Sequence, residues 1–72
     1  DAASFYTKAA KRRTNEFTSP VYWMKAGLVY EELGDYTKAL DAYEQIKENY
    51  PESTEADQIE KYITRVQLKM DN

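Results

Sequence analysis

The stretch LGDYTKALDAYEQI, residues 33–46, decides the fold of this chain. Gly34 can adopt the left-handed backbone conformation that ends a helix, and Asp35 has a side chain that caps the start of the next one. Beyond this pair, apolar residues recur at spacings of three and four, which is the period of an α-helix and not of a strand. The stretch therefore predicts a tight junction between two helices.

The same period runs through the rest of the chain and predicts an all-α fold. Ser19 and Pro20 form a helix start signal, because serine can cap backbone N–H groups and proline loses nothing at the first helical position. Pro51 disfavours helical geometry in the residue before it. Thr54 and Asp57 have the spacing of a capping box. The expected helices cover approximately residues 2–14, 20–33, 36–49 and 54–70.

Each expected helix has an apolar side that we assign to the core. Gly27 and Ala39, near the middles of the second and third helices, predict that the two helix axes approach closely there, with aromatic side chains on either side. The last helix has a narrower apolar stripe. The residues expected inward are Ala2, Phe5, Tyr6, Ala9 and Ala10; Trp23, Ala26, Gly27, Tyr30 and Leu33; Tyr36, Ala39, Leu40, Tyr43, Ile46 and Tyr50; and Ala56, Ile59, Ile63, Val66 and Met70.

The composition argues against an enzyme. The 72 residues contain no cysteine and no histidine, which removes thiol nucleophiles, the commonest general base and the commonest transition-metal ligand. Carboxylates such as Glu31 with Glu32, and Asp41 with Glu44, give no sign of burial, so we assign them to solvated helix surface. We therefore expect no catalytic residue, no metal site and no cofactor.

The length of the chain limits it to one small domain with a thin core. Its apolar runs fall far short of the roughly 20 residues that a membrane-spanning helix needs, so we expect no membrane insertion by this segment. The first residue is Asp1 and not methionine, which suggests a segment of a longer protein that could carry a signal or an anchor. The lack of cysteine is compatible with either redox compartment.

The net charge of -3 is unevenly distributed, with basic ends and an acidic middle. Lys8, Lys11 and Arg12 lie at i, i+3 and i+4, with Arg13 beside them, and such a patch can attract phosphates. A solvated helix face is the simpler interpretation, because the chain as a whole is acidic and no stacking platform accompanies the patch. We therefore expect no nucleic-acid partner.

Residues 20–53 make a 34-residue unit that resembles a tetratricopeptide repeat, whose pattern is W-x2-L-G-x2-Y, then A-x3-F, then P. The resemblance implies a helical hairpin, and it implies that the matching residues pack the hairpin and do not bind ligands. Two residues depart from the pattern. Ala26 stands at a position where leucine is usual, and Ile46 stands at a position where the family prefers alanine. The matching residues are Trp23, Gly27, Tyr30, Ala39, Tyr43 and Pro51.

The resemblance also suggests how the single domain of residues 1–72 is divided. Ala2, Tyr6 and Ala9 repeat the spacing of three residues in the third helix at an offset of 37, so residues 1–19 resemble the second helix of a preceding repeat. Residues 54–72 resemble a capping or following helix. The expected architecture is a short α-α superhelix of stacked antiparallel hairpins. The style of the sequence resembles bacterial tetratricopeptide proteins of the cell envelope, and the compartment stays open.

Family function resides on the concave face that the first helix of each repeat forms, which implies a non-catalytic module that binds a protein or peptide. Val21, Met24 and Leu28 form an apolar strip there, at spacings of three and four. Lys25 alone does not reproduce the lysine and asparagine pattern with which some members hold a terminal carboxylate, and the neighbouring acids would repel an acidic tail. The candidate contact residues are Val21, Met24, Lys25, Leu28, Glu31 and Glu32.

Self-association is the alternative function that the sequence leaves open. The apolar strip can be covered by neighbouring repeats or by a second copy of the chain, because about three repeats are generally needed for stability and this chain has one with two flanking helices. Leu68 lies nearly opposite the apolar stripe of the last helix, so it can mark the side where a further helix or a second copy docks.

Overall fold

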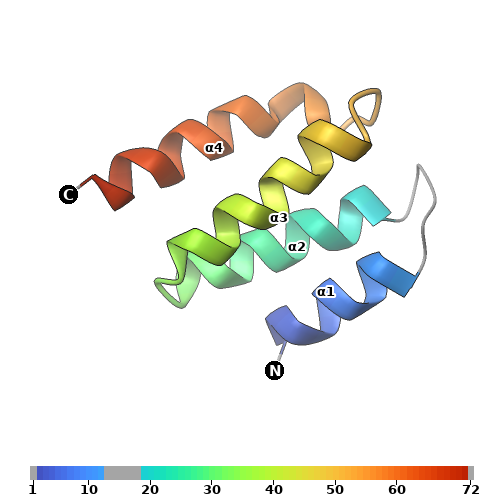
Figure 1. The fold of residues 1–72 in the computed structure, drawn as a ribbon, viewed down its shortest axis with the longest axis horizontal. Helices are drawn as coiled ribbons and strands as arrows, with labels where there is room; N and C mark the ends of the chain where they lie inside the picture. The colour runs from blue at the N-terminus through green and yellow to red at the C-terminus, as the bar shows by residue number, and fades with distance from the viewer. Residues whose placement is uncertain (1, 13–18, 72) are drawn as a thin grey trace.

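The computed structural model describes residues 2–12 and 19–71, and these residues form four helices (Figure 1). The expected all-α fold and the number of helices are confirmed, and the third helix has the expected bounds. The second helix is displaced by one residue, and the fourth begins two residues later than expected. The helices are α1 (Ala2–Arg12), α2 (Ser19–Glu32), α3 (Tyr36–Asn49) and α4 (Ala56–Met70).

Each helix packs against the next one along the chain. Successive helices run in opposite directions, so α2 and α4 run the same way on either side of α3, and α1 lies at the far edge beside α2 (Figure 1). The Cα atoms fill a slab of 35 × 27 × 13 Å. A slab this thin has two broad surfaces, and every helix reaches solvent on at least one side.

The junction between α2 and α3 forms as the sequence predicts. Gly34 has a φ of 79°, in the left-handed region, and the Asp35 N–H donates to the Tyr30 carbonyl at 2.9 Å. The Gly34 N–H donates to the Glu31 carbonyl at 3.0 Å, so the last carbonyls of α2 are satisfied. Asp35 Oδ1 accepts from the Lys38 N–H at 3.3 Å and caps α3.

The start of α4 differs from the expectation. The capping box of Thr54 and Asp57 is wrong, because Ser53 supplies the cap. Ser53 Oγ accepts from the Ala56 N–H at 3.1 Å and donates to the Tyr50 carbonyl at 2.8 Å. One hydroxyl thus joins the end of α3 to the beginning of α4, and the helix starts three residues after it.

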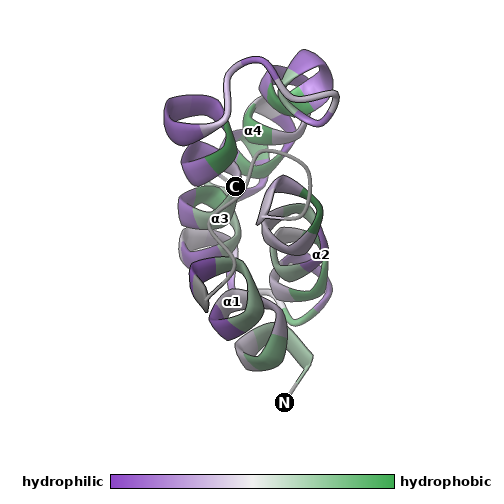
Figure 2. Cartoon of the chain, turned by 90° about the vertical axis from the view of Figure 1, so that its right-hand side faces the viewer, coloured by the Kyte–Doolittle hydropathy of each residue, from purple (hydrophilic) through white to green (hydrophobic). Residues whose placement is uncertain are grey.

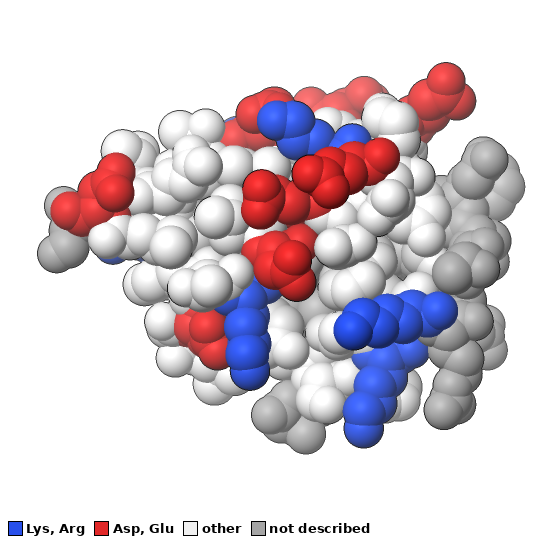
Figure 3. All heavy atoms as spheres, viewed as in Figure 1, with Lys and Arg blue, Asp and Glu red and all other residues white. Residues whose placement is uncertain are grey.

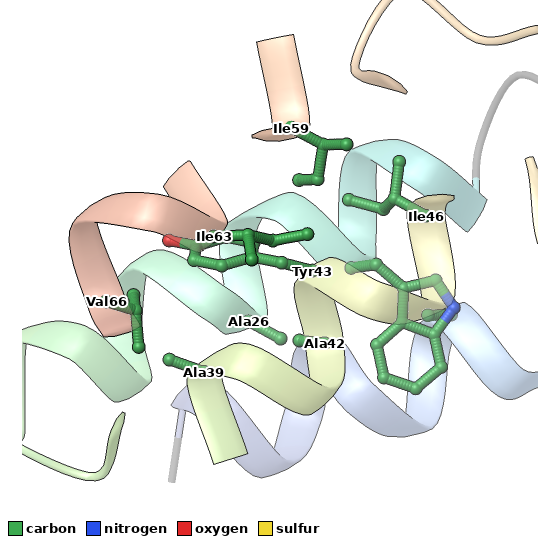
Figure 4. Close-up of a cluster of buried hydrophobic side chains, with 10 residues drawn as sticks. Ala26, Ala39, Ala42, Tyr43, Ile46, Ile59, Ile63 and Val66 are labelled. Carbon is green, nitrogen blue, oxygen red and sulfur yellow. The ribbon is translucent and has the colours of Figure 1, made fainter. Parts of the chain in front are cut away.

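The core lies between α3 and its two neighbours (Figure 4). Tyr43 and Ile46 of α3 are fully buried, as are Ile59 and Val66 of α4. Burying side chains of this size stabilises the fold by roughly 1.5–3 kcal/mol each. Ile46 stands where the repeat pattern prefers alanine, and α4 accommodates it within the same buried cluster. Figure 2 shows the green apolar residues mainly on the sides of the helices that face one another.

Gly27 is required by the ring of Tyr43. A Cβ atom built at Gly27 would clash with Tyr43 Cε1, Cδ1 and Cζ, so the ring of α3 lies directly on the backbone of α2. Tyr43 is itself fully buried and cannot swing away without opening the core. The small residue in α2 therefore makes room for an aromatic side chain at this crossing.

Some residues expected inward are exposed. Phe5 is 64% exposed and Leu33 is 66% exposed, while Ala2 and Met70 are also on the surface. Only one narrow side of α1 meets α2, and Ala3 fills it where Ala2 and Phe5 were expected. Leu33 follows the last residue of α2, and Met70 is the last residue of α4. Periodicity correctly marks apolar sides, but it does not guarantee that a neighbour covers them.

Candidate functional site

The side of α2 that faces α1 is fixed by polar and aromatic contacts. Ser19 Oγ donates to the Ala10 carbonyl at 3.0 Å, and this buried hydroxyl joins the start of α2 to the end of α1. The rings of Tyr6 and Tyr22 stack with their centroids 6.4 Å apart. A second side of α2, which carries Gly27, is covered by α3. These two contacts leave a third side of α2 for the predicted apolar strip.

The three residues of the predicted apolar strip lie along one line of α2. Val21 and Met24 are partly buried, and Leu28 is 39% exposed. Met24 also packs against the core cluster, so the strip is supported from below. The same line continues to Glu31, which lies three residues after Leu28 and therefore points to the same side of the helix.

Lys25 and Glu32 lie on the edge of α2 nearer to α1. Both are exposed, and their spacing of seven residues places them on one line of the helix. Lys25 Nζ lies 5.7 Å from the centroid of the Tyr6 ring, a cation–π contact with α1. This edge thus carries one positive and one negative charge that are open to solvent.

Glu31 differs from the other candidate residues because it is bound by α4. Its side chain is only 7% exposed. Arg65 donates twice to it, from Nη2 to Oε1 at 2.6 Å and from Nε to Oε2 at 3.1 Å. Lys69 Nζ lies 3.4 Å from Oε2, and the Tyr43 hydroxyl donates to Oε1 at 2.6 Å. The sequence-based assignment of Glu31 to solvated surface is therefore wrong.

The pKa values of this cluster follow from its geometry. Burial alone raises the pKa of Glu31, but the hydrogen bonds from Arg65 and Tyr43 outweigh it and leave the pKa below its ordinary value. Burial and the hydrogen bond to Glu31 raise the pKa of Tyr43, so the phenol keeps its proton. The hydrogen bond to Glu31 likewise raises the pKa of Arg65. Arg65 and Tyr43 therefore both donate to one ionised carboxylate.

Tyr62 completes the α4 side of this region. Its ring lies 5.6 Å from the Tyr43 ring, and the Arg65 guanidinium lies 4.8 Å from the Tyr62 centroid. Arg65 is thus held both by the carboxylate of α2 and by an aromatic ring of its own helix. We call the combined surface the α2–α4 face. It comprises Val21, Met24, Leu28 and Glu31 of α2 with Tyr62, Arg65 and Lys69 of α4.

The remaining charged groups include no candidate metal site in the part of the chain that the structure describes. Residues 2–12 and 19–71 contain no group of acidic residues arranged to hold a metal ion. Asp41 and Glu44 are exposed, as expected, and Figure 3 shows acidic side chains along α3 and basic ones near α1. Lys8 and Lys11 are exposed, whereas the Arg12 side chain and Arg13 lie outside the described residues.

A hollow of about 450 Å³ lies at the turn between α3 and α4, lined by residues 49–55. None of the helices in the described ranges combines the length and the apolar character needed to cross a membrane. The α2–α4 face is therefore the best-defined candidate site.

A family model supports the repeat that the helices form. The model described as tetratricopeptide repeat matches residues 22–53, which cover most of α2, the Gly34 junction, all of α3 and the first part of the turn to α4. Residues 22–53 are a tetratricopeptide repeat. Tetratricopeptide repeats generally mediate protein–protein interaction or scaffolding, and the family is generally non-catalytic. No match is found among curated proteins or solved structures.

The residues that carry the repeat pattern pack the repeat together. Trp23 and Gly27 of α2 are buried, as are Ala39 and Tyr43 of α3. Tyr30 is partly buried and its hydroxyl lies 3.4 Å from that of Thr7 in α1. Pro51 is exposed at the turn that follows α3. α1 lies before the matched residues and α4 begins after them.

Sequence reasoning missed the part of the α2–α4 face that α4 contributes. Glu31 and Arg65 are 34 residues apart, which is the length of one tetratricopeptide repeat. An acid and a base separated by one repeat length are the signal that could have indicated this contact. Tyr62 carries no such signal, because its role depends on where the Tyr43 ring lies.

Proposed function

We propose that this chain is a non-catalytic interaction module that binds a partner helix or an extended peptide on the uncovered side of α2. The observation that carries the proposal is the distribution of apolar residues in α2. They occur around the whole helix, whereas those of α1 and α4 are concentrated on one side. A helix that is apolar all round is normally buried all round. The side with Leu28 is instead open to solvent, which suits a binding surface.

The binding mechanism is the burial of apolar side chains against the strip of Val21, Met24 and Leu28. The 14 residues of α2 provide a track of about 20 Å, long enough for a partner helix of three to four turns. Lys25 and Glu32 lie along the rim, where polar groups set orientation more than affinity. Helices of this kind dock in apolar tracks through side chains at spacings of three and four.

The proposal is tested with a synthetic helical peptide of neutral composition. The peptide is acetylated and amidated, with leucines at i, i+3 and i+7 and glutamines between them. Its binding is followed by fluorescence anisotropy of an attached dye. Leu28→Glu is expected to weaken binding at least tenfold, because it places a charge in the apolar contact. Leu33→Glu is the matched control, since it makes the same change at an exposed position outside the strip.

The outcome is read together with the helical content of each variant. Both variants should keep the circular dichroism spectrum of the unchanged protein, because both leucines are exposed. Equal loss of binding in both variants would place the contact elsewhere. Binding that survives Leu28→Glu unchanged would contradict the proposed surface.

Self-association is the second candidate, and one observation favours it. At the offset of 37 residues that relates α1 to α3, Phe5 corresponds to Ala42. Ala42 is 1% exposed, whereas Phe5 is 64% exposed. The side of α1 that carries Phe5 therefore resembles a helix side that is covered in the complete repeat. A second copy of the chain is one way to cover it.

This second candidate is tested by light scattering across a concentration series. Self-association through α1 should raise the average mass with concentration, and Phe5→Glu should abolish the increase. Leu68→Glu makes a similar change on α4, where Leu68 is 62% exposed, and it should leave self-association through α1 unchanged. A monomer at all concentrations would exclude the candidate.

A further inference from the structure

Helix α4 carries a row of cations, two of which, Arg65 and Lys69, belong to the α2–α4 face. Residues 61–70 contain Lys61, Arg65 and Lys69, at regular intervals of four residues, and no acidic residue. The Arg65 and Lys69 side chains remain 45% exposed, although both contact Glu31. Arg65 and Lys69 are therefore held by the fold and still open to solvent, and Lys61 is exposed.

The charge of the row is only partly balanced within the chain. Glu31 is the one carboxylate bonded to the row among residues 2–12 and 19–71, and it contacts two of the three cations, Arg65 and Lys69. Glu32 lies on the other edge of α2, on the line of Lys25. The expectation that Glu31 and Glu32 together repel an acidic partner therefore does not fit the structure. The α2–α4 face has an excess of positive charge along α4.

Arg65 is held in a defined orientation for a further ligand. A guanidinium has five N–H donors. Nε and Nη2 donate to Glu31, and the ring of Tyr62 lies 4.8 Å from the guanidinium carbon. Nη1 donates no hydrogen bond to Glu31. Because the group is already fixed, binding a carboxylate there loses less side-chain entropy than it would on a free arginine.

We propose that the α2–α4 face selects a partner segment that is both apolar and acidic. Its apolar side chains lie on the strip of Val21, Met24 and Leu28, and its acidic side chains lie along Lys61, Arg65 and Lys69. This inference rests on the proposed function, and it adds the charge of the partner and the side on which that charge lies. The partner is a polypeptide, because the apolar strip and the cations must be contacted together.

The spacing of the cations favours acidic side chains over a terminal carboxylate. Eight residues separate Lys61 from Lys69, which corresponds to about 12 Å along the helix. One carboxylate cannot reach all three cations over this length. Two or three acidic side chains on successive turns of a partner helix can, and each such exposed pair contributes a modest share of affinity.

The test compares three peptides that share the leucine pattern described above and differ in the flanking residues. The flanking residues are all glutamate in the first peptide, all glutamine in the second and all lysine in the third. All three peptides are acetylated and amidated, so that no terminal charge contributes to binding. At low salt, the glutamate peptide should bind about tenfold or more tightly than the glutamine peptide, and the lysine peptide should bind most weakly. The difference should shrink as salt is raised.

Variants of the protein locate the effect. Lys61→Gln combined with Lys69→Gln should weaken binding of the glutamate peptide by about two- to fivefold for each charge removed. The affinity for the glutamine peptide should not change. Lys8→Gln combined with Lys11→Gln is the matched control, because these exposed lysines lie on α1. The control should retain the full preference for glutamate.

The outcomes separate this inference from the proposed function. Equal binding of all three peptides, with a clear loss in Leu28→Glu, would contradict the charge preference and leave the proposed function in place. The inference would also be overturned if the protein with both α1 lysines changed lost its preference for the glutamate peptide while the protein with both α4 lysines changed kept it. Failure of all three peptides to bind would contradict both.

Discussion

Glu31 and Arg65 are joined by two parallel hydrogen bonds, although 34 residues separate them. The pair connects α2 to α4, which do not follow one another in the chain. Bidentate arginine–carboxylate contacts are directional as well as strong. The pair therefore fixes how α4 sits relative to the repeat, and the Tyr43 hydroxyl beneath it ties the contact to the core.

Glu31→Ala should destabilise the protein by about 1–3 kcal/mol, because it leaves the buried Tyr43 hydroxyl without its acceptor and removes the partner of Arg65. The matched control is Glu32→Ala, an exposed neighbour, for which we expect a change within about 0.5 kcal/mol. Urea unfolding followed by circular dichroism measures both. Equal stability of the two variants would show that the contact contributes little.

The contribution of Glu31 should depend on pH. Its pKa in the folded protein is below the ordinary value of 4.5, so folding favours the charged form. The resulting stabilisation is complete above about pH 4.5 and is lost as the pH falls through the lowered pKa of the folded state. The stability difference between the unchanged protein and Glu31→Gln should therefore be constant near neutral pH and decrease below about pH 4.5. A difference that grows in acid would contradict this assignment.

Gly27→Ala should destabilise the protein, although alanine normally favours a helix by about 0.5–1 kcal/mol over glycine. The new methyl group would clash with the buried Tyr43 ring, and overpacking of this kind costs about 1–3 kcal/mol. Thermal unfolding measures the change. In a double-mutant cycle, Tyr43→Leu should reduce the cost of Gly27→Ala, because the ring that causes the clash is gone. Additive effects would argue against the clash.

Ser53→Ala should weaken the connection between α3 and α4 by about 0.5–2 kcal/mol, because the hydroxyl both caps the Ala56 N–H and donates to the Tyr50 carbonyl. Thr54→Ala is the control at the neighbouring position that the sequence first favoured, and it should change stability by less than about 0.5 kcal/mol. If urea unfolding showed that Thr54→Ala lowers stability more than Ser53→Ala does, Thr54 and not Ser53 would be the cap of α4.

Local chemistry explains why much of the fold follows from the sequence. Gly34 and Asp35 need only their own backbone geometry and near neighbours to end one helix and begin the next, so their roles could be predicted. The apolar strip of α2 follows from spacing in the same way. Phe5 and Leu33 were assigned inward because periodicity marks an apolar side, yet covering that side requires a neighbouring helix.

The candidate site was less predictable because half of it depends on how distant helices are placed. Nothing near Glu31 in the sequence indicates that its carboxylate is removed from solvent. The contact with Arg65 exists only once α3 has brought α4 beside α2. Tyr62 likewise gains its role from the ring of Tyr43. The sign of the charge on the α2–α4 face therefore emerges from tertiary structure and not from the charges of α2 alone.

Tyr43 also has a consequence for cooperativity. Tyr43 belongs to α3, and its ring lies against Gly27 of α2 and close to the Tyr62 ring of α4. These three helices therefore share one central side chain. α1 packs mainly on α2 and buries small residues such as Ala3 and Ala10. Amide hydrogens of α2, α3 and α4 should therefore exchange with solvent together, in one opening event, while those of α1 exchange earlier and independently.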